Sequence, residues 1–220
     1  MGVCYIVGAA ASSPELSPRE GDLVIAADAG YAALEGAGIR PDLAVGDFDS
    51  LGYVPQDVPV ERHPVMKDDT DTMLAVKLGL ARGFRDFRIY GGLGGRRTDH
   101  TVANIQTLGY LAARGAAGWL FGAGETMTAL RDGTLSFSGA RRGTLSLFAL
   151  GGPARGVTLR GVLYPLSDAA LAPDFPLGVS NSFTDGPAEV SVREGALLVV
   201  WSGEGPLPER IPAQKGENRA

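Results

Sequence analysis

Apolar and polar positions in the first half of the chain alternate between strand-like and helix-like patterns. Short apolar runs that end at glycine, acidic or polar residues predict buried strands at 3–7, 23–27, 43–45, 87–90 and 119–121. Longer periodic segments predict helices at 31–37, 72–82 and 101–113. Strands that alternate with helices indicate a mostly parallel sheet covered on both faces.

The pattern changes after about Gly124. Short segments that alternate polar and apolar residues predict strands at 126–131, 134–138, 144–149, 157–159, 188–193 and 196–201. Turn-forming residues separate them, among them Asp132-Gly133 and Glu194-Gly195. This rhythm is typical of an antiparallel β-sandwich or barrel, so the chain is predicted to be α/β followed by all-β.

Composition narrows the classes of function. The 220 residues carry a net charge of −5, which disfavours a nucleic-acid binder because such a protein needs a basic face. The single cysteine, Cys4, rules out an internal disulfide, is expected to be a small buried side chain, and makes a cytoplasmic location the default expectation. No apolar run approaches the roughly 18 residues of a membrane helix, so no membrane association is expected.

The run GDFDS at 46–50 places Asp47 and Asp49 directly after a predicted strand. Residues two apart in extended backbone point to the same side, so the two carboxylates would share one small volume. At roughly 4 Å two like charges repel by about 4 kcal/mol at an effective dielectric constant of 20. Mg²⁺ removes that repulsion, and it binds one or two carboxylates plus substrate phosphates. The alternative is an ordinary turn, since Asp and Ser are common turn formers.

The run at 67–71, KDDTD, opens the second predicted helix. Thr70 or Asp69 can cap this helix, and the helix dipole favours Asp71 in its first turn. Three carboxylates within four residues exceed what capping requires, and the adjacent Lys67 can hold a phosphate. Both a structural and a phosphate-binding interpretation therefore remain open for this run.

The segment at 91–100 is glycine-rich, then basic, then acidic, and leads into the third predicted helix. Glycines let the backbone approach a phosphate closely, and the helix N-terminus that follows offers free N–H groups. It is not a Walker A motif, because no GK[ST] follows. His100 can be a general base, although a structural hydrogen bond at the helix start is the more common role. Asp28, Asp47 and the glycine loop all follow predicted strands, so they can converge at one edge of the sheet.

Five stretches, taken in order, resemble the thiamine pyrophosphokinase family. They are AADAG at 26–30, PDLAVGDFDS at 41–50, KDDTDTMLAV at 67–76, GGLGGRRTDHTVANI at 91–105, and LYPL with GVSNSF at 163–166 and 178–183. Ala29 stands where the family usually has glycine. The segment from Arg96 to Asp99 is one residue longer than the family pattern, so either Arg96 or Arg97 is the family arginine.

The resemblance implies a fold, an activity and an assembly. The fold would be a Rossmann-like, three-layer α/β domain over 1–123 that binds ATP and Mg²⁺, a β-sandwich over 124–204 for thiamine binding and dimerisation, and a polar tail over 205–220. The activity would be transfer of the pyrophosphoryl group from the co-substrate ATP to the thiamine hydroxyl, giving thiamine diphosphate and AMP. The assembly would be a homodimer with thiamine near the interface.

The resemblance also implies roles for individual residues. Asp47, Asp49 and Asp71 would bind Mg²⁺. Asp99 would be a further catalytic acid that orients or deprotonates the hydroxyl, or that holds another active-site residue in place without touching the substrate. The residues implied for ATP and its phosphates are Asp28, Lys67, Asp68, Thr70, Arg96, Arg97 and His100. The residues implied for thiamine are Tyr164, Ser180 and Asn181, which the residue pattern alone places in surface turns.

Two rival functions fit the same residues. One is a different Mg²⁺-dependent phosphotransferase or phosphohydrolase, which would use the same carboxylates on another acceptor. The other is a non-catalytic nucleotide- or thiamine-binding regulator, whose mark would be the loss of one of the aspartates. Every one of those aspartates is present in this chain.

Overall fold

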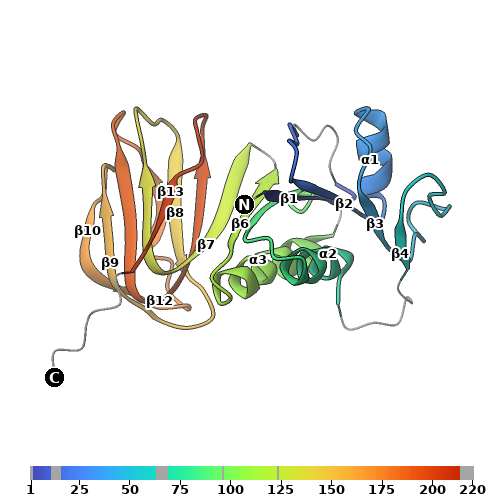
Figure 1. Cartoon of the computed structure of the whole chain (residues 1–220). Helices are drawn as coiled ribbons and strands as arrows, with labels where there is room; N and C mark the ends of the chain where they lie inside the picture. The colour runs from blue at the N-terminus through green and yellow to red at the C-terminus, as the bar shows by residue number, and fades with distance from the viewer. Residues whose placement is uncertain (1, 11–15, 63–68, 96, 123, 214–220) are drawn as a thin grey trace, which may run out of the picture. The chain divides into compact units, whose positions relative to one another are not determined.

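The computed structural model describes residues 2–10, 16–62, 69–95, 97–122 and 124–213 (Figure 1). Its chain divides into two compact units, Met1–Thr126 and Met127–Ala220, which we call unit 1 and unit 2. None of the helices in the described ranges has the length and apolar character needed to cross a membrane.

Unit 1 is built on a parallel sheet. Its strands in spatial order are β6 (Ala117–Gly122), β5 (Asp86–Tyr90), β1 (Val3–Val7), β2 (Leu23–Ala27), β3 (Leu43–Gly46) and β4 (Val60–Arg62). All neighbouring pairs in this order are parallel. Helix α1 (Gly30–Gly36) lies on one side of the sheet, and α2 (Asp71–Ala81) and α3 (Thr98–Ala112) lie on the other (Figure 1). The predicted mixture of helices with a parallel sheet is confirmed.

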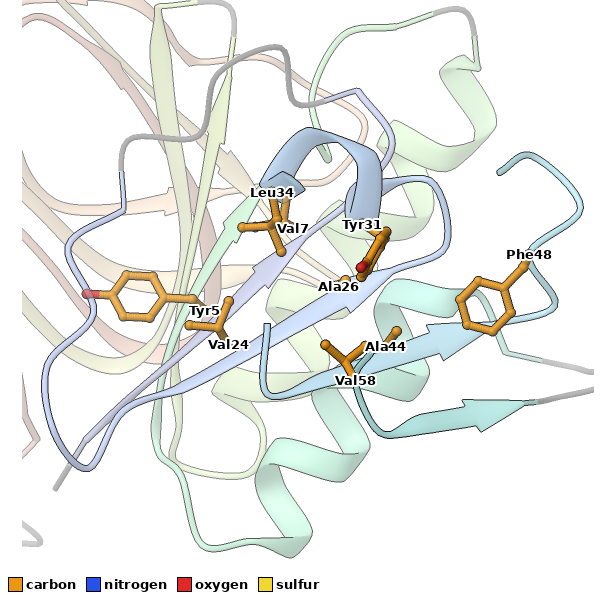
Figure 2. Close-up of a cluster of buried hydrophobic side chains, with 9 residues drawn as sticks. All are labelled: Tyr5, Val7, Val24, Ala26, Tyr31, Leu34, Ala44, Phe48 and Val58. Carbon is orange, nitrogen blue, oxygen red and sulfur yellow. The ribbon is translucent and has the colours of Figure 1, made fainter. Parts of the chain in front are cut away.

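The strands form where the sequence is apolar on both faces, as expected for a sheet covered by helices. Every residue of β2 and β3 is buried. Figure 2 shows one cluster on the α1 side of the sheet, made of Tyr5, Val7, Val24, Ala26, Tyr31, Leu34, Ala44, Phe48 and Val58. Each large side chain buried in this way stabilises the fold by about 1.5–3 kcal/mol. Phe48 belongs to this cluster although it follows the end of β3, so it anchors the loop there.

The order of the strands creates a crevice at β1. The chain builds β2, β3 and β4 on one side of β1 and then crosses to build β5 and β6 on the other side. Ligands of open α/β sheets bind outside the carboxyl ends of the strands at such a reversal. The ends of β1 and β5, at Val7 and Tyr90, are therefore the expected place for a binding site.

Unit 2 contains β-strands and no helix among the residues described. Its strands are β7 (Glu125–Phe137), β8 (Thr144–Ala149), β9 (Ala154–Arg160), β10 (Leu166–Leu171), β11 (Gly178–Ser182), β12 (Ala188–Ser202) and β13 (Glu209–Pro212). Antiparallel pairing joins β10 to β9, β9 to β12, β12 to β8, β8 to β11 and β13 to β7. The first half of β12 pairs with β9 and its last part pairs with β8, so the strand changes partner near Gly195.

Two predicted turns are instead irregular points inside long strands. Asp132-Gly133 lies within β7 and Glu194-Gly195 within β12. Asp132 has φ 42° and Gly195 has φ 100°, so both depart from extended backbone. The Gly195 N–H donates to Asp132 Oδ1 at 3.0 Å, which joins the two points. Left-handed residues of this kind occur both at bulges and in hairpin turns, and the residue pattern alone does not distinguish them.

Several other elements differ from the prediction. Strands β4, β10, β11 and β13 were not predicted, because their residues are largely partly or fully exposed and form no apolar run. Helix α3 begins at Thr98, which puts Asp99 in its first turn, where negative charge is favourable.

Cys4 is fully buried as predicted, and this burial raises the pKa of its thiol to about 12.

Gly195→Ala is expected to destabilise unit 2 by more than about 1 kcal/mol, because an alanine is strained at positive φ. A Cβ at Gly195 would lie 2.6 Å from the Pro153 carbonyl oxygen. Gly152→Ala is the control, since nothing lies within 4 Å of its added Cβ. Urea unfolding should show a lower midpoint for Gly195→Ala alone, and equal midpoints for both variants would contradict the assignment.

Candidate active site

A cavity of about 440 Å³ opens in unit 1 at the reversal of strand order. Backbone from the ends of β1 and β5 and the first turns of α2 and α3 contribute to its wall. The lining residues are Gly8, Ala9, Ala10, Ala27, Asp28, Ser50, Thr70, Asp71, Thr72, Gly91, Gly92, Gly94, Gly95, Arg97, His100 and Asn104. Glycine and alanine leave the backbone of this wall uncovered, so a phosphate chain can approach it closely.

Three carboxylates gather beside this cavity. One oxygen from each of Asp28, Asp47 and Asp49 lies within 4.8 Å of the other two. Asp28 follows β2, and the other two follow β3, its parallel neighbour in the sheet. Asp28 is only 8% exposed, whereas Asp49 is open to solvent. Of the predicted metal set, Asp47 and Asp49 lie in this group and Asp71 does not. Asp28, predicted as an ATP contact, is the third member instead.

The backbone around these carboxylates is unusual. Asp28 has φ 48° and Phe48 has φ 65°, conformations that cost side-chain-bearing residues about 1–3 kcal/mol each. Strand β3 ends at Gly46, so Asp47 and Asp49 meet through a turn, in which the Asp49 N–H donates to Asp47 Oδ1 at 3.2 Å. A Cβ at Gly46 would lie 3.2 Å from the Asp28 Cα. Glycine there lets the two strand ends approach.

Asp28 is held in an environment that disfavours its charge. Burial raises its pKa, hydrogen bonds from the Ser50 side chain and the Ala29 N–H oppose that rise, and the charges of Asp71 and Asp49 add to it. Among the described residues, Asp28 Oδ1 is buried without a hydrogen-bond partner. A bound cation would satisfy this oxygen and reverse the repulsion, and an all-oxygen donor set suits Mg²⁺. The side chains present therefore fit a magnesium site.

The start of α2 forms another part of the wall. The Thr70 side chain caps this helix by accepting from the Met73 N–H at 3.2 Å, and Asp71 lies in the first turn. Both residues line the cavity. Asp69, just before the helix, forms an ion pair at 2.6 Å with Lys77 of α2, so its charge is balanced by that lysine. Lys67 and Asp68, predicted to contact ATP, lie outside the described residues.

The glycine loop after β5 is fixed from behind by Asn104. This buried side chain, on α3, donates from Nδ2 to the Gly92 carbonyl at 2.9 Å. A Cβ at Gly92 would lie 3.0 Å from the same amide and 2.6 Å from Leu120, so a larger residue there would displace both side chains. Sequence reasoning did not select Asn104. Its signal was a lone amide on the apolar face of a predicted helix, four residues after His100.

Arg97 and Asp99 form a pair at the entrance to α3. The guanidinium Nη2 lies 2.6 Å from Asp99 Oδ2, and Nε donates to Oδ1 at 2.9 Å. These hydrogen bonds lower the pKa of Asp99 to about 2, which makes it a weak base in this arrangement. Arg97 and His100 both line the cavity. Arg96, the other arginine predicted to contact phosphate, lies outside the described residues.

Comparison with known proteins identifies the family. The model named "Thiamin pyrophosphokinase, catalytic domain" matches residues 17–117. The model named "Thiamin pyrophosphokinase, vitamin B1 binding domain" matches residues 135–197. The chain belongs to the thiamine pyrophosphokinase family. The first match contains the acidic residues and most of the lining of the cavity, and the second contains Tyr164, Ser180 and Asn181.

Relatives of this family agree along nearly the whole chain. A thiamine pyrophosphokinase of Bacillus subtilis is 27% identical over 190 residues, covering 83% of this chain and 88% of that protein. A crystal structure of the Bacillus subtilis thiamine pyrophosphokinase has a TM-score of 0.79 at 25% identity, covering 92% of this chain and 100% of that one. The Geobacillus thermodenitrificans thiamin pyrophosphokinase has a TM-score of 0.75 at 27% identity, with 93% and 99% covered.

The three residues predicted to contact thiamine all lie in unit 2 of this thiamine pyrophosphokinase family member. Tyr164 is 65% exposed, between β9 and β10. Ser180 is exposed on β11 with φ 61°, and its N–H donates to Ser146 Oγ at 3.1 Å. Asn181 is buried, and its side chain bonds to backbone: Oδ1 accepts from the Tyr164 N–H at 3.0 Å and Nδ2 donates to the Tyr164 carbonyl.

Asp28→Asn is expected to raise the melting temperature measured without divalent ions, because it removes a buried charge that repels Asp49 and Asp71. The rise should be about 2–4 °C, the change that about 1 kcal/mol gives in a chain of this size. Mg²⁺ should raise the melting temperature of the unmodified protein and change that of the variant much less. Glu20→Gln, an exposed change outside the carboxylate cluster, is the control and should respond to Mg²⁺ normally.

An equal Mg²⁺-dependent rise in the unmodified protein and in Asp28→Asn would contradict the placement of the ion beside Asp28. This measurement requires no substrate, so it tests the metal site separately from the reaction.

Proposed function

We propose that this chain is a thiamine pyrophosphokinase that transfers the pyrophosphoryl group of ATP to the hydroxyl of thiamine. The observation that carries the proposal is the carboxylate cluster of Asp28, Asp47 and Asp49 beside a glycine-lined cavity, in a chain that both family models match. The cluster supplies a site for a cation, the cavity suits a nucleotide's phosphates, and the family relationship supplies the acceptor.

The reaction is a displacement at phosphorus. The thiamine hydroxyl oxygen forms a bond to the β-phosphorus of ATP, and the bond from that phosphorus to the oxygen bridging to the α-phosphorus breaks. AMP leaves with that oxygen, the hydroxyl proton is released, and thiamine diphosphate forms. Little covalent chemistry falls to the protein in such transfers, so positioning and charge stabilisation dominate.

The cavity in unit 1 is the proposed site of the ATP phosphates. Its volume of about 440 Å³ and its glycine-lined wall support this placement. Arg97 lines the cavity and can hold phosphate oxygens, while Asp99 keeps the guanidinium in position through their ion pair. The lowered pKa of Asp99 favours this positioning role over that of a general base. Lys67, Asp68 and Arg96 remain predicted phosphate contacts on the family resemblance.

Asp47 and Asp49 are the proposed ligands of Mg²⁺, together with Asp28 on the neighbouring strand end. Their mutual distances, within 4.8 Å, support this set. Asp71, also predicted as a ligand, lines the cavity near Asp28, whose pKa its charge helps to raise. A bound Mg²⁺ would neutralise charge on the phosphate oxygens. The protein's own contribution is to hold the carboxylates in place before the ion arrives.

Thiamine is proposed to bind at unit 2, where Tyr164 offers an exposed aromatic face to a cationic ring. We infer that unit 1 is a Rossmann-like, three-layer domain and that unit 2 is a β-sandwich. The reversal of strand order at β1 supports the Rossmann-like fold of unit 1. The change of partner along β12 supports the sandwich of unit 2. The tail from 205 onward includes β13, which pairs with β7.

A homodimer with thiamine near the interface is part of the proposal. Its support in this chain is a set of exposed apolar side chains in unit 2, namely Phe148, Leu163, Tyr164, Phe175, Leu177 and Val179. Large apolar side chains at a surface are typical of contact with another molecule when they gather in a patch. A cytoplasmic location stays a prediction, which the single cysteine favours.

The direct test is incubation of the protein with ATP, Mg²⁺ and thiamine, followed by separation of the nucleotides and thiamine esters. Thiamine diphosphate and AMP should form in equal amounts. ADP in place of AMP, or ATP hydrolysis that does not depend on thiamine, would favour the rival phosphotransferase or phosphohydrolase. Binding of both substrates without turnover would favour the regulatory rival.

Asp47→Asn should lower turnover in this assay by about a hundredfold or more, the loss that follows when a charge-stabilising group is removed. The melting temperature should change little, because asparagine keeps the oxygen that accepts from the Asp49 N–H. Glu20→Gln makes the same chemical change away from the carboxylates and should keep full activity. A fully active Asp47→Asn would show that the metal assignment is wrong.

Tyr164→Ala should raise the KM for thiamine by about tenfold, since a cation–π contact contributes about 0.5–2 kcal/mol. The KM for ATP should stay within a factor of about two, the ordinary spread for a change that removes no contact to that substrate. Tyr164→Phe keeps the ring and is the matched control. Equal increases in both KM values would argue against stacking on thiamine.

A further inference from the structure

Asn181 was predicted as a thiamine ligand, yet its side chain is directed at the protein's own backbone. Only 5% of the residue is exposed. Its Oδ1 accepts from the Tyr164 N–H at 3.0 Å and from the Ser182 N–H at 2.9 Å, and its Nδ2 donates to the Tyr164 carbonyl at 2.6 Å. One amide side chain therefore binds both polar backbone groups of Tyr164.

These contacts extend a short antiparallel pairing between the ends of two segments. Val162 and Phe183 form an isolated bridge, and the Leu163 N–H donates to the Ser182 carbonyl at 2.9 Å. At the next residue, Tyr164, the Asn181 side chain supplies the hydrogen bonds to both backbone polar groups. Pro165 follows Tyr164, and a residue before proline is confined to extended backbone. The Tyr164 backbone is thus fixed from two directions.

The side chain of Tyr164 is not covered by the same contacts. The residue is 65% exposed although both of its backbone polar groups are bonded. Neighbouring Ser180 adopts φ 61°, so the backbone of β11 is irregular just before Asn181. A fixed backbone that carries an exposed ring is pre-organised for a ligand, because the cost of ordering it is met in folding rather than in binding.

We propose that Asn181 is a positioning residue for thiamine binding, which acts by clasping the Tyr164 backbone and does not itself contact the substrate. This inference rests on the proposed function, and it assigns to Asn181 a role different from the one that the sequence suggested. Without the clasp, the Tyr164 backbone must be ordered each time thiamine binds, which corresponds to about a tenfold loss of affinity.

A double-mutant cycle on the full-length protein separates the two roles. Asn181→Ala should raise the KM for thiamine about tenfold, while kcat and the KM for ATP stay within about twofold. In the Tyr164→Ala background, Asn181→Ala should add no further increase, because no ring remains to be positioned. Multiplication of the two increases would instead show that Asn181 contacts thiamine directly and would overturn the proposal.

Two further variants control for folding. Asn181→Asp keeps the size of the side chain but places a carboxylate oxygen against the Tyr164 carbonyl oxygen, so its KM for thiamine should rise at least as much as that of Asn181→Ala. Ser202→Ala removes another side chain to backbone hydrogen bond of unit 2, to the Thr144 N–H, and should leave the KM for thiamine unchanged. If Ser202→Ala raised the KM for thiamine by a similar factor, the effect of Asn181→Ala would be explained by a general loosening of unit 2. That result would overturn the proposal.

Hydrogen exchange at the Tyr164 amide gives a measurement that needs no substrate. Exchange should be slow in the unmodified protein and fast in Asn181→Ala, with the amides of β12 unaffected. Equal exchange rates in the two proteins would overturn the clasp. Absence of thiamine diphosphate formation by the unmodified protein would instead overturn the proposed function, so the two failures are distinguished before any variant is compared.

Discussion

The repulsion between carboxylates gathered at the ends of β2 and β3 is the constraint on which the site depends. Like charges within 4.8 Å separate unless the backbone holds them, and here the backbone adopts positive φ at Asp28 and Phe48 to do so. That strain persists only because surrounding packing over-determines it. The Phe48 ring, embedded in the core cluster on the α1 side, provides that packing (Figure 2). The hydrophobic core therefore maintains an electrostatic arrangement that is unfavourable without a cation.

Much of the site could be predicted from the sequence because its residues follow apolar runs. Parallel strands bring their carboxyl ends to one edge, so Asp28 and Asp47 were expected together from their positions alone. The conformation of the loop was not predictable in the same way. Asp47 and Asp49 meet through a turn with a left-handed Phe48, and periodicity carries no information about a single residue of positive φ. Asn104 was not predicted, because its partner is the Gly92 backbone carbonyl, and a backbone atom leaves no mark in the residue pattern.

The parallel half of the fold was easier to predict than the antiparallel half. In unit 1, β2 and β3 are buried throughout and β1 is buried after its first residue, so each reads as an apolar run. In unit 2, β10 and β11 are largely exposed or partly exposed and are bonded with register shifts. At Asp132 and Gly195 the local chemistry of a hairpin turn occurs inside continuous strands, because a hydrogen bond between the two points stabilises both irregularities at once. Such tertiary pairing overrides local preference and is not visible in either segment separately.

Cys4 is the second residue of β1, has no solvent exposure, and lies beside Gly79 and Phe87. A thiol whose pKa is about 12 is almost entirely protonated at neutral pH, and only the thiolate is reactive. As the chain has no second cysteine, thiol-directed reagents such as maleimides have no accessible thiol in the folded protein. The unmodified protein should therefore take up no thiol-directed label. A cysteine introduced on any outer strand then becomes a unique attachment point for a fluorophore or spin label.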